Sequence, residues 1–420
     1  MRIELRNIGP LNRAEVDLDG FSIVAGPNAS GKTTLSTICY AVLLCRPRAE
    51  AAVERLVLAS DRRRESRSPD PAELSEVYAS SFRTHLAFEL ERCLGPDLAK
   101  LPRRGRTGNG SAPRIVVSHS QDGNEPWRLV FRLRDGGLHL EPRYPGYCEP
   151  RFDHIAEMSA LRRMSLRRRR ATHPVYFPAA RSGYVQMQSV LYSLLLSALG
   201  RGLYGDISVG KIPGIASDFL QFLAGMDPEH ESAIPETTAD RLEEELIHGH
   251  LRVLPSETAK VIEFSPQGLE EYWTMDASAT SIAEIAPLLL YCRHRATSRD
   301  LLFIDEPEAH LHPGNQIVLA DILLQLSGSL QGMVIGTHSE FFVMGVSNSL
   351  LRAHVEERDL PHVKLYELVR AETTGGYVTK SSVVDPGAGF AVGQFSDVAE
   401  IALDEGEELF VRSQTEERDS

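Results

Sequence analysis

One stretch of eight residues constrains the fold more than any other part of the chain. Gly26-Pro-Asn-Ala-Ser-Gly-Lys-Thr33 has the spacing G-x-x-x-x-G-K-[ST], with the apolar run Phe21–Ala25 before it and a helical pattern from Lys32 after it. In this setting the backbone N–H groups of the loop surround a phosphate, and the helix N-terminus adds a partial positive charge. The sequence therefore predicts a phosphate-binding loop between a strand and a helix.

The side chains of this loop have separate tasks. Lys32 would place a positive charge against the β- and γ-oxygens of a triphosphate, and the Thr33 hydroxyl would contact Mg²⁺. The expected phosphate contacts are Gly26, Pro27, Asn28, Ala29, Ser30, Gly31, Lys32, Thr33 and Thr34.

A second segment, far along the chain, supplies acids. Leu301–Ile304 is an apolar run too short for an independent helix, and Asp305 and Glu306 follow it directly. This pattern predicts a buried parallel strand that delivers two carboxylates to its C-terminal edge, where open α/β sheets bind their ligands. Asp305 is expected to hold Mg²⁺, and Glu306 to act as the general base for an attacking water.

The residues after this strand carry a family resemblance. Ile304-Asp-Glu-Pro-Glu-Ala-His-Leu-His-Pro313 is followed by an apolar strand pattern, Gly332–Gly336, and by Thr337-His-Ser339. With the phosphate loop, this order resembles ABC-type ATPases of the branch that contains the SMC and RecF proteins and the OLD nucleases. The resemblance implies a P-loop NTPase fold of ABC type, binding of ATP and Mg²⁺, and dimerisation of two heads around ATP.

The resemblance also assigns roles to the histidines. It makes His338 the switch residue that contacts the γ-phosphate and, with Lys32 and Glu306, a catalytic residue; a polar cap at a strand end is the alternative. Residues 308–312 take the place of a loop at the dimer interface. His310 and His312 lie two positions apart, and an interface role is favoured over a pair of metal ligands.

The signature segment of the family is matched incompletely. Such ATPases have a helix start, rich in serine and glycine, that meets the γ-phosphate bound to the partner subunit. The corresponding place here is Asp276–Ser281, which lacks the glycines. Ser278, Thr280 and Ser281 are its candidates, because they are suitable N-cap residues at an anion-binding helix start.

Another segment, Pro178–Gly183, resembles a Pro-Ala-x-Arg sequence of OLD-like ATPases. It makes Arg181 a candidate contact to a phosphate or to an interface. Gln186 and Gln188 are the alternatives.

Periodic patterns predict the remaining elements. A helix should follow the loop over residues 34–44 and end at Pro47, a second should cover Pro71–Cys93, and a third, with six arginines, residues 152–170. Three alternating segments, which predict an antiparallel unit, lie at 114–118, 127–134 and 138–142.

We therefore expect an α/β fold with a central, mostly parallel sheet, an antiparallel β-subdomain and a mixed α/β basic insertion. The expected units are 1–45 and 173–345 for the two halves of the ATPase head, 46–172 for the insertion, and 346–420 for a β-containing extension with an acidic tail.

Charge is distributed unevenly along the chain. The formal net charge is −13, but residues 46–181 contain 26 Lys and Arg against 17 Asp and Glu. A basic lobe on an acidic body is typical of a protein that touches a phosphate polymer with one part, although solvated arginine-rich faces are the alternative. The insertion is thus a candidate contact for DNA or a phage protein.

Several classes are disfavoured by composition. No stretch approaches twenty apolar residues, and the first residues lack the apolar core of a signal peptide, so we expect a cytoplasmic protein without a membrane partner. Five scattered cysteines without C-x-x-C spacing argue against a disulfide framework and a structural zinc site.

Residues 340–420 hold no Asp-x-Asp, so the Toprim nuclease domain of OLD proteins is not expected. By resemblance, such an ATPase forms a homodimer or higher homo-oligomer and acts with a separately encoded effector, a nuclease or toxin, in bacterial anti-phage defence. The alternatives are an ATP-gated DNA-binding protein of repair or recombination, a slow-hydrolysing protein-interaction scaffold and, least supported, a transporter subunit.

Overall fold

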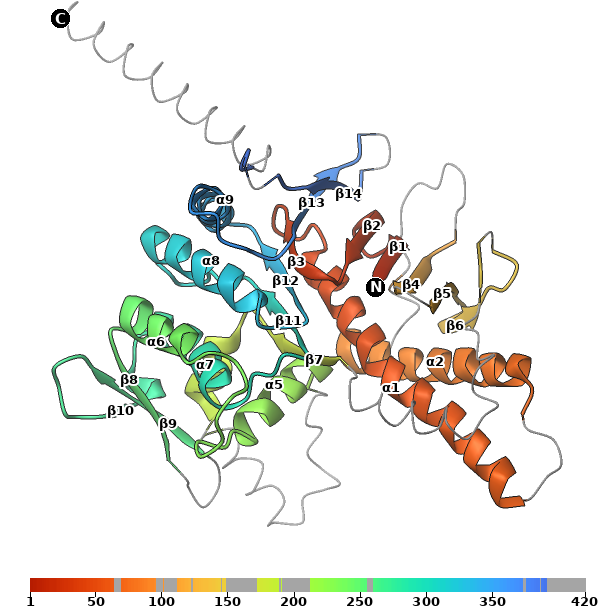
Figure 1. The fold of residues 1–420 in the computed structure, drawn as a ribbon, viewed down its shortest axis with the longest axis horizontal. Helices are drawn as coiled ribbons and strands as arrows, with labels where there is room; N and C mark the ends of the chain where they lie inside the picture. Colours follow the sequence, from red (N-terminus) through yellow and green to blue (C-terminus); the bar gives the residue numbers. More distant parts are fainter. Residues whose placement is uncertain are drawn as a thin grey trace, which may run out of the picture.

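The computed structural model describes residues 1–63, 69–95, 101, 112–121, 124–144, 146–148, 172–188, 190, 212–254, 260–372, 375–385 and 387–390. Within them the chain forms an eleven-stranded mixed sheet with helices on both faces and a separate three-stranded sheet (Figure 1). The predicted α/β fold class is confirmed.

The large sheet has the strand order β6-β5-β4-β1-β2-β14-β13-β3-β12-β11-β7. Its strands are β1 (Arg2–Ile8), β2 (Leu11–Asp17), β3 (Gly20–Ala25), β4 (Arg114–Gln121), β5 (Asn124–Arg134), β6 (Gly137–Leu140), β7 (His173–Phe177), β11 (Asp300–Asp305), β12 (Gly332–Thr337), β13 (Val363–Arg370) and β14 (Tyr377–Val383). Neighbours from β13 through β3, β12 and β11 to β7 are parallel, whereas neighbours from β2 to β6 are antiparallel. The predicted parallel core and antiparallel unit are therefore two ends of one sheet.

The helices are α1 (Lys32–Arg63), α2 (Pro71–Leu94), α5 (Gly214–Ala224), α6 (Thr237–Leu242), α7 (Thr280–His294), α8 (Pro313–Ser327) and α9 (Glu340–Val355), and residues 181–188 are also helical. Two short turns, the π-helix η2 (Glu243–Ile247) and the 3₁₀-helix η3 (Met275–Ala277), flank the small sheet of β8 (Gly249–Leu254), β9 (Val261–Pro266) and β10 (Trp273–Thr274). None of the described helices is long and apolar enough to cross a membrane.

Two hydrophobic cores lie on opposite faces of the large sheet, because side chains alternate along its strands. On β3, Ile23 packs in the core with α7, α8 and α9, and Val24 in the core with α1 and α2, which lie on the other side in Figure 1. On β11, Ile304 and Phe303 divide in the same way. Asp305 follows Phe303 by two residues, so its side chain points to the α1 face at the C-terminal end of β11.

The helix after the loop is longer than the sequence predicts, since α1 continues through Pro47 to Arg63. Pro47 has no N–H to donate to the Leu43 carbonyl, which normally kinks or ends a helix. Beyond it, Ala49 and Val53 are fully buried in the core that α1 shares with α2. This packing outweighs the missing hydrogen bond, so the prediction that the helix ends at Pro47 is wrong.

The predicted α2 and β4–β6 are confirmed, and β4 pairs with β1, so this part of the insertion extends the main sheet. At the other end of the chain, β13 pairs with β3 and β14 with β2. The predicted arginine-rich helix at 152–170 and the acidic tail lie outside the described residues.

Candidate active site

The loop between β3 and α1 packs closely against the turn between β1 and β2 and against β13. Gly31 has a φ of +104°, and a Cβ there would lie 2.8 Å from Pro10 Cγ. A Cβ on Gly26 would lie 2.9 Å from Leu368 Cβ of β13. Both glycines are thus required by the close approach of neighbouring atoms, and Gly31 also by its left-handed backbone.

A pocket of about 600 Å³ opens over this loop. It is lined by Pro10, Asn28, Ala29, Ser30, Gly31, Lys32, Thr33, Thr34, Glu306 and His338. The loop, the end of β11 and the end of β12 therefore meet at one cavity although they lie far apart in the sequence. The parallel neighbours β3, β12 and β11 bring them there.

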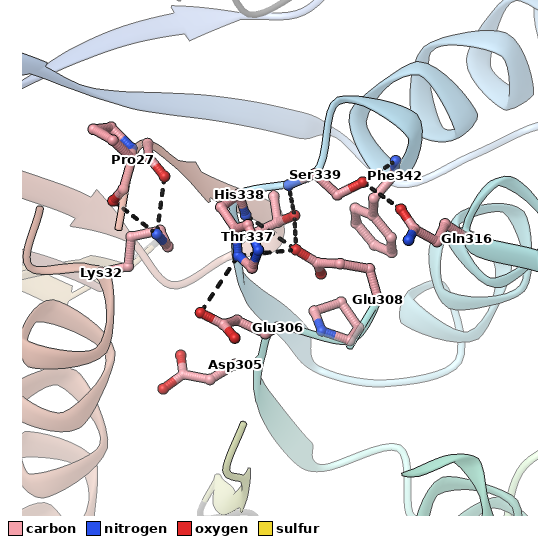
Figure 2. Close-up of polar contacts among 12 residues, drawn as sticks. Pro27, Lys32, Asp305, Glu306, Glu308, Gln316, Thr337, His338, Ser339 and Phe342 are labelled. Atoms are coloured by element: carbon pink, nitrogen blue, oxygen red, sulfur yellow. Dashed lines mark hydrogen bonds and ion pairs between the residues drawn. The ribbon is translucent and has the colours of Figure 1, made fainter. Parts of the chain in front are cut away.

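Lys32 is 6% exposed and folds back over the loop. Its Nζ donates to the carbonyls of Gly26, at 2.9 Å, and Pro27, at 3.0 Å (Figure 2). Burial lowers the pKa of Lys32, and the carboxylates of Glu306, Glu308 and Asp305 oppose that shift. The site thus places the Lys32 ammonium group next to three carboxylates.

The two oxygens of Asp305 differ in their surroundings. Oδ2 accepts a 2.7 Å hydrogen bond from the Tyr176 hydroxyl, whereas Oδ1 is buried and makes no hydrogen bond among the described residues. Gly336 of β12 lies between the strand that ends at Asp305 and the loop, because a Cβ on it would be 2.8 Å from Oδ1 and 3.8 Å from Lys32 Cβ. The acid strand and the loop therefore meet here, as the sequence predicts. Burial raises the pKa of Asp305 to about 6, against the hydroxyls of Tyr176 and Thr33, which lower it.

These surroundings fit a magnesium ion. Asp305 Oδ1 and the Thr33 hydroxyl are oxygen ligands of the hard kind that Mg²⁺ prefers. No group of three or more His, Cys, Asp or Glu side chains suited to a metal occurs among the described residues. Mg²⁺ is usually bound through one or two carboxylates together with substrate phosphates and water, so two protein oxygens are compatible with it.

His338 lies between two carboxylates at the end of β12 (Figure 2). Its Nδ1 is 3.4 Å from Glu306 Oε1 and 3.6 Å from Glu308 Oε1. Glu308 is 3% exposed, and its Oε1 accepts hydrogen bonds from the Thr337 hydroxyl, at 2.6 Å, and from the His338 N–H, at 3.0 Å. Glu308 thus holds the end of β12, a function that the sequence analysis did not assign to it.

Glu306 turns away from its strand with a φ of +49°. This left-handed region costs a residue with a Cβ about 1–2 kcal/mol. Its N–H donates to the Gly336 carbonyl at 2.7 Å, which holds the turn. The turn brings the carboxylate of Glu306 to the pocket while that of Asp305 stays buried.

The two histidines of the segment 308–312 are held differently. His312 is the N-cap of α8, and its Nδ1 accepts from the Gly314 N–H at 3.2 Å. His310 has a left-handed backbone, with a φ of +60°. Capping α8 is therefore a structural role of His312 that the sequence did not predict.

Arg181 does not contact the pocket. Its guanidinium is buried, with Nη2 2.9 Å from Glu284 Oε1 of α7. Its nitrogens also donate to the carbonyls of Pro178, Glu284, Asp305, Glu306 and Pro307. The expectation that Arg181 meets a phosphate or an interface is corrected, since its hydrogen bonds are used to hold the end of the acid strand against α7.

The start of α7 differs from the expected capped helix start. Ala279 occupies the N-cap position, and no side chain caps the helix. Ser278 instead donates to the Thr274 carbonyl at 3.2 Å, and Thr280 is exposed. None of the candidates Ser278, Thr280 and Ser281 lines the loop pocket.

The two glutamine alternatives are also away from the pocket lining. Gln186 Nε2 donates to the Ser278 carbonyl at 3.4 Å, which links the helical residues 181–188 to the start of α7. Gln188 is 4% exposed.

Part of this site matches a known family. Residues 282–343 match the family described as AAA ATPase domain. The matched segment runs from α7 into α9 and includes Asp305, Glu306 and His338, but not the phosphate loop. No curated protein matches the chain.

Solved structures of SMC head domains are similar at low identity. One is the Smc head bound to the C-winged helix domain of ScpA, with 14% identity, a TM-score of 0.45, and coverage of 91% of this chain and 97% of that chain. Another is an Smc head domain with an extended coiled coil bound to the C-terminal domain of ScpA derived from Pyrococcus furiosus, with 14% identity, a TM-score of 0.43, and coverage of 97% and 98%. A third is the SMC head domain from Thermotoga maritima, with 12% identity, a TM-score of 0.36, and coverage of 91% and 98%.

Proposed function

We propose that the chain binds ATP together with Mg²⁺ and hydrolyses the terminal phosphate bond. The observation that carries this proposal is the shared pocket, which Lys32, Glu306 and His338 all line. Beside Lys32, Asp305 keeps one buried oxygen without a hydrogen bond among the described residues.

Each group has a task set by its chemistry. The loop N–H groups and Lys32 would bind phosphate oxygens. The Thr33 hydroxyl and Asp305 Oδ1 would hold Mg²⁺, whose charge, when bound, stabilises negative charge on the phosphates. The Glu306 carboxylate would take the proton of the attacking water. His338, whose Nδ1 is 3.4 Å from that carboxylate, would contact the terminal phosphate.

A second copy of the chain would complete the site. The start of α7 is accessible and carries the hydroxyls of Ser278, Thr280 and Ser281. A helix N-terminus attracts anions, so this segment would meet the terminal phosphate on the loop of the partner subunit. Residues 308–312 would lie at the same interface.

Binding of a fluorescent ATP analogue, phosphate release and sedimentation test this proposal on the full chain. The wild type should bind with Mg²⁺, hydrolyse ATP and gain mass with ATP, whereas Lys32→Ala should lose binding. A wild-type chain that neither binds ATP nor releases phosphate would refute the proposal, as would hydrolysis by Lys32→Ala at the wild-type rate.

On the resemblance of residues 304–313 to OLD-like ATPases, we also propose that the ATPase regulates a separately encoded effector, a nuclease or toxin, in anti-phage defence in the cytoplasm. In this arrangement, 1–45 and 173–345 act as the head, 46–172 as the contact for the effector or trigger, and 346–420 as the extension. Loss of phage resistance on deletion, together with recovery of a nuclease or toxin bound to the chain, would support it.

The positive charge of residues 46–181 favours a second candidate, an ATP-gated DNA-binding protein. Neutralised phosphates release counterions, so DNA affinity should fall steeply with salt. Salt-insensitive binding to a protein partner would instead favour an effector or a scaffold.

A further inference from the structure

A tyrosine of β7 contacts the carboxylate proposed to hold the metal. In the parallel pair of β7 and β11, Tyr176 is in register with Phe303, so both side chains point to the α1 face. Their rings stack at 5.7 Å with an interplanar angle of 7°. Asp305 is two residues beyond Phe303 on the same face, and the Tyr176 hydroxyl reaches its Oδ2 at 2.7 Å.

The ring of Tyr176 has little freedom to move. Tyr40 of α1 packs edge-on against it at 5.3 Å, and Tyr176 is 3% exposed. A tyrosine hydroxyl carries its proton at neutral pH, so at 2.7 Å from Oδ2 it is the donor to the carboxylate. A charge-assisted hydrogen bond from a packed ring holds one oxygen in a defined place.

The segment that follows β7 holds the backbone of the same acids. Arg181 donates to the carbonyls of Asp305, Glu306 and Pro307. Residues 176–181 therefore position both the side chain and the main chain at the end of β11, while Asp305 Oδ1 is left without a hydrogen bond among the described residues.

We propose that Tyr176 is a positioning residue of the metal site: its hydroxyl occupies Asp305 Oδ2 and thereby presents Oδ1 to a divalent cation. This inference rests on the proposed function and adds a residue to it. Tyr176 sets the affinity for Mg²⁺ and leaves the affinity for the metal-free nucleotide unchanged, because its hydroxyl donates to Asp305 and its side chain does not line the loop pocket. Groups that orient metal ligands in this way typically change metal affinity by about 10–100-fold when they are removed.

The test titrates Mg²⁺ into the full-length Tyr176→Phe variant in the presence of a fluorescent ATP analogue. The half-saturating Mg²⁺ concentration should rise by about 10-fold or more, whereas binding of the analogue in EDTA stays at the wild-type value. Tyr40→Phe is the matched control: it removes a hydroxyl from the same aromatic group, but that hydroxyl donates to Asp218 and not to Asp305. Tyr40→Phe should keep the wild-type Mg²⁺ dependence.

Two further variants separate positioning from damage to the fold. In an Asp305→Asn background, Tyr176→Phe should add no further loss of Mg²⁺ affinity, because the two residues act through one ligand. Tyr176→Met, which fills the place without a hydroxyl, should give the same shift as Tyr176→Phe. Wild-type Mg²⁺ dependence in Tyr176→Phe, or an equal loss in the Asp305→Asn background, would overturn this inference and leave ATP binding intact. If the wild type itself bound no analogue with Mg²⁺, the proposed function would fail instead.

Discussion

The phosphate loop and the start of α7, the two segments that we propose to contact ATP, differ in how their side chains are held. At the loop, Lys32, Asp305 and His338 each have partners within the chain. At the start of α7, Ala279 cannot cap the helix, and Thr280 is exposed. The contrast teaches that intrachain contacts hold the side chains on the loop side of the proposed site, which we call the catalytic half, whereas the start of α7 is exposed.

The largest expected effect tests the catalytic half. Glu306→Gln removes the carboxylate that would accept the proton of water, so ATP hydrolysis should fall by about 10³-fold. Binding of ATP should persist, since the loop and Lys32 remain. Phosphate release and equilibrium binding measure the two quantities, and near wild-type hydrolysis would show that Glu306 is not the general base.

Arg181→Ala tests how firmly the catalytic half is held. It leaves Glu284 buried without its ion-pair partner and removes the donors to the carbonyls after β11, so the free energy of unfolding should drop by about 3–5 kcal/mol. Arg241→Ala is the control, because Arg241 is 30% exposed and its partners Glu245 and Asp321 are 38% and 13% exposed, so the substitution should cost less, about 1 kcal/mol. Urea denaturation measures both losses. Equal losses in the two variants would mean that the buried contacts of Arg181 stabilise the fold no more than the ion pairs of Arg241.

A third variant tests whether α7 serves a partner subunit. Thr280→Arg places a long side chain at the exposed helix start and should weaken ATP-dependent dimerisation about tenfold or more, or ~1.4 kcal/mol. Binding of ATP to the loop should be unchanged. Thr84→Arg, at an exposed position of α2, is the control for the added charge. Sedimentation with and without ATP measures the dimerisation of both variants. Unaltered dimerisation of Thr280→Arg would place the interface elsewhere.

The smallest effect concerns the missing cap of α7. Ala279→Ser supplies a side-chain oxygen that can accept from a backbone N–H of the first turn and should raise the free energy of unfolding by about 0.5–1 kcal/mol. Ala279→Val, which cannot accept a hydrogen bond, should bring no such gain. Thermal unfolding of the two variants measures the difference.

Much of the catalytic half could be predicted, because its motifs are local. The loop spacing, the apolar run before Asp305 and Glu306, and the strand before His338 each lie within a few consecutive residues. The start of α7 was predicted less well: polar residues near a helix start indicated caps, but the chain entered the helix one residue away, with Ala279 at the N-cap. The length of α1 was missed because burial beyond Pro47 depends on α2.

The sequence by itself determined the phosphate loop, the acid strand and the α/β class, since each follows from local spacing and from the period of apolar residues. Only the tertiary structure decided that Tyr176 holds Asp305, that Glu308 holds the end of β12, and that Arg181 serves the fold. Those contacts join residues that are distant in sequence or that point to one another only after the backbone turns. Strand register and side-chain direction create them, and neither can be read from a single segment.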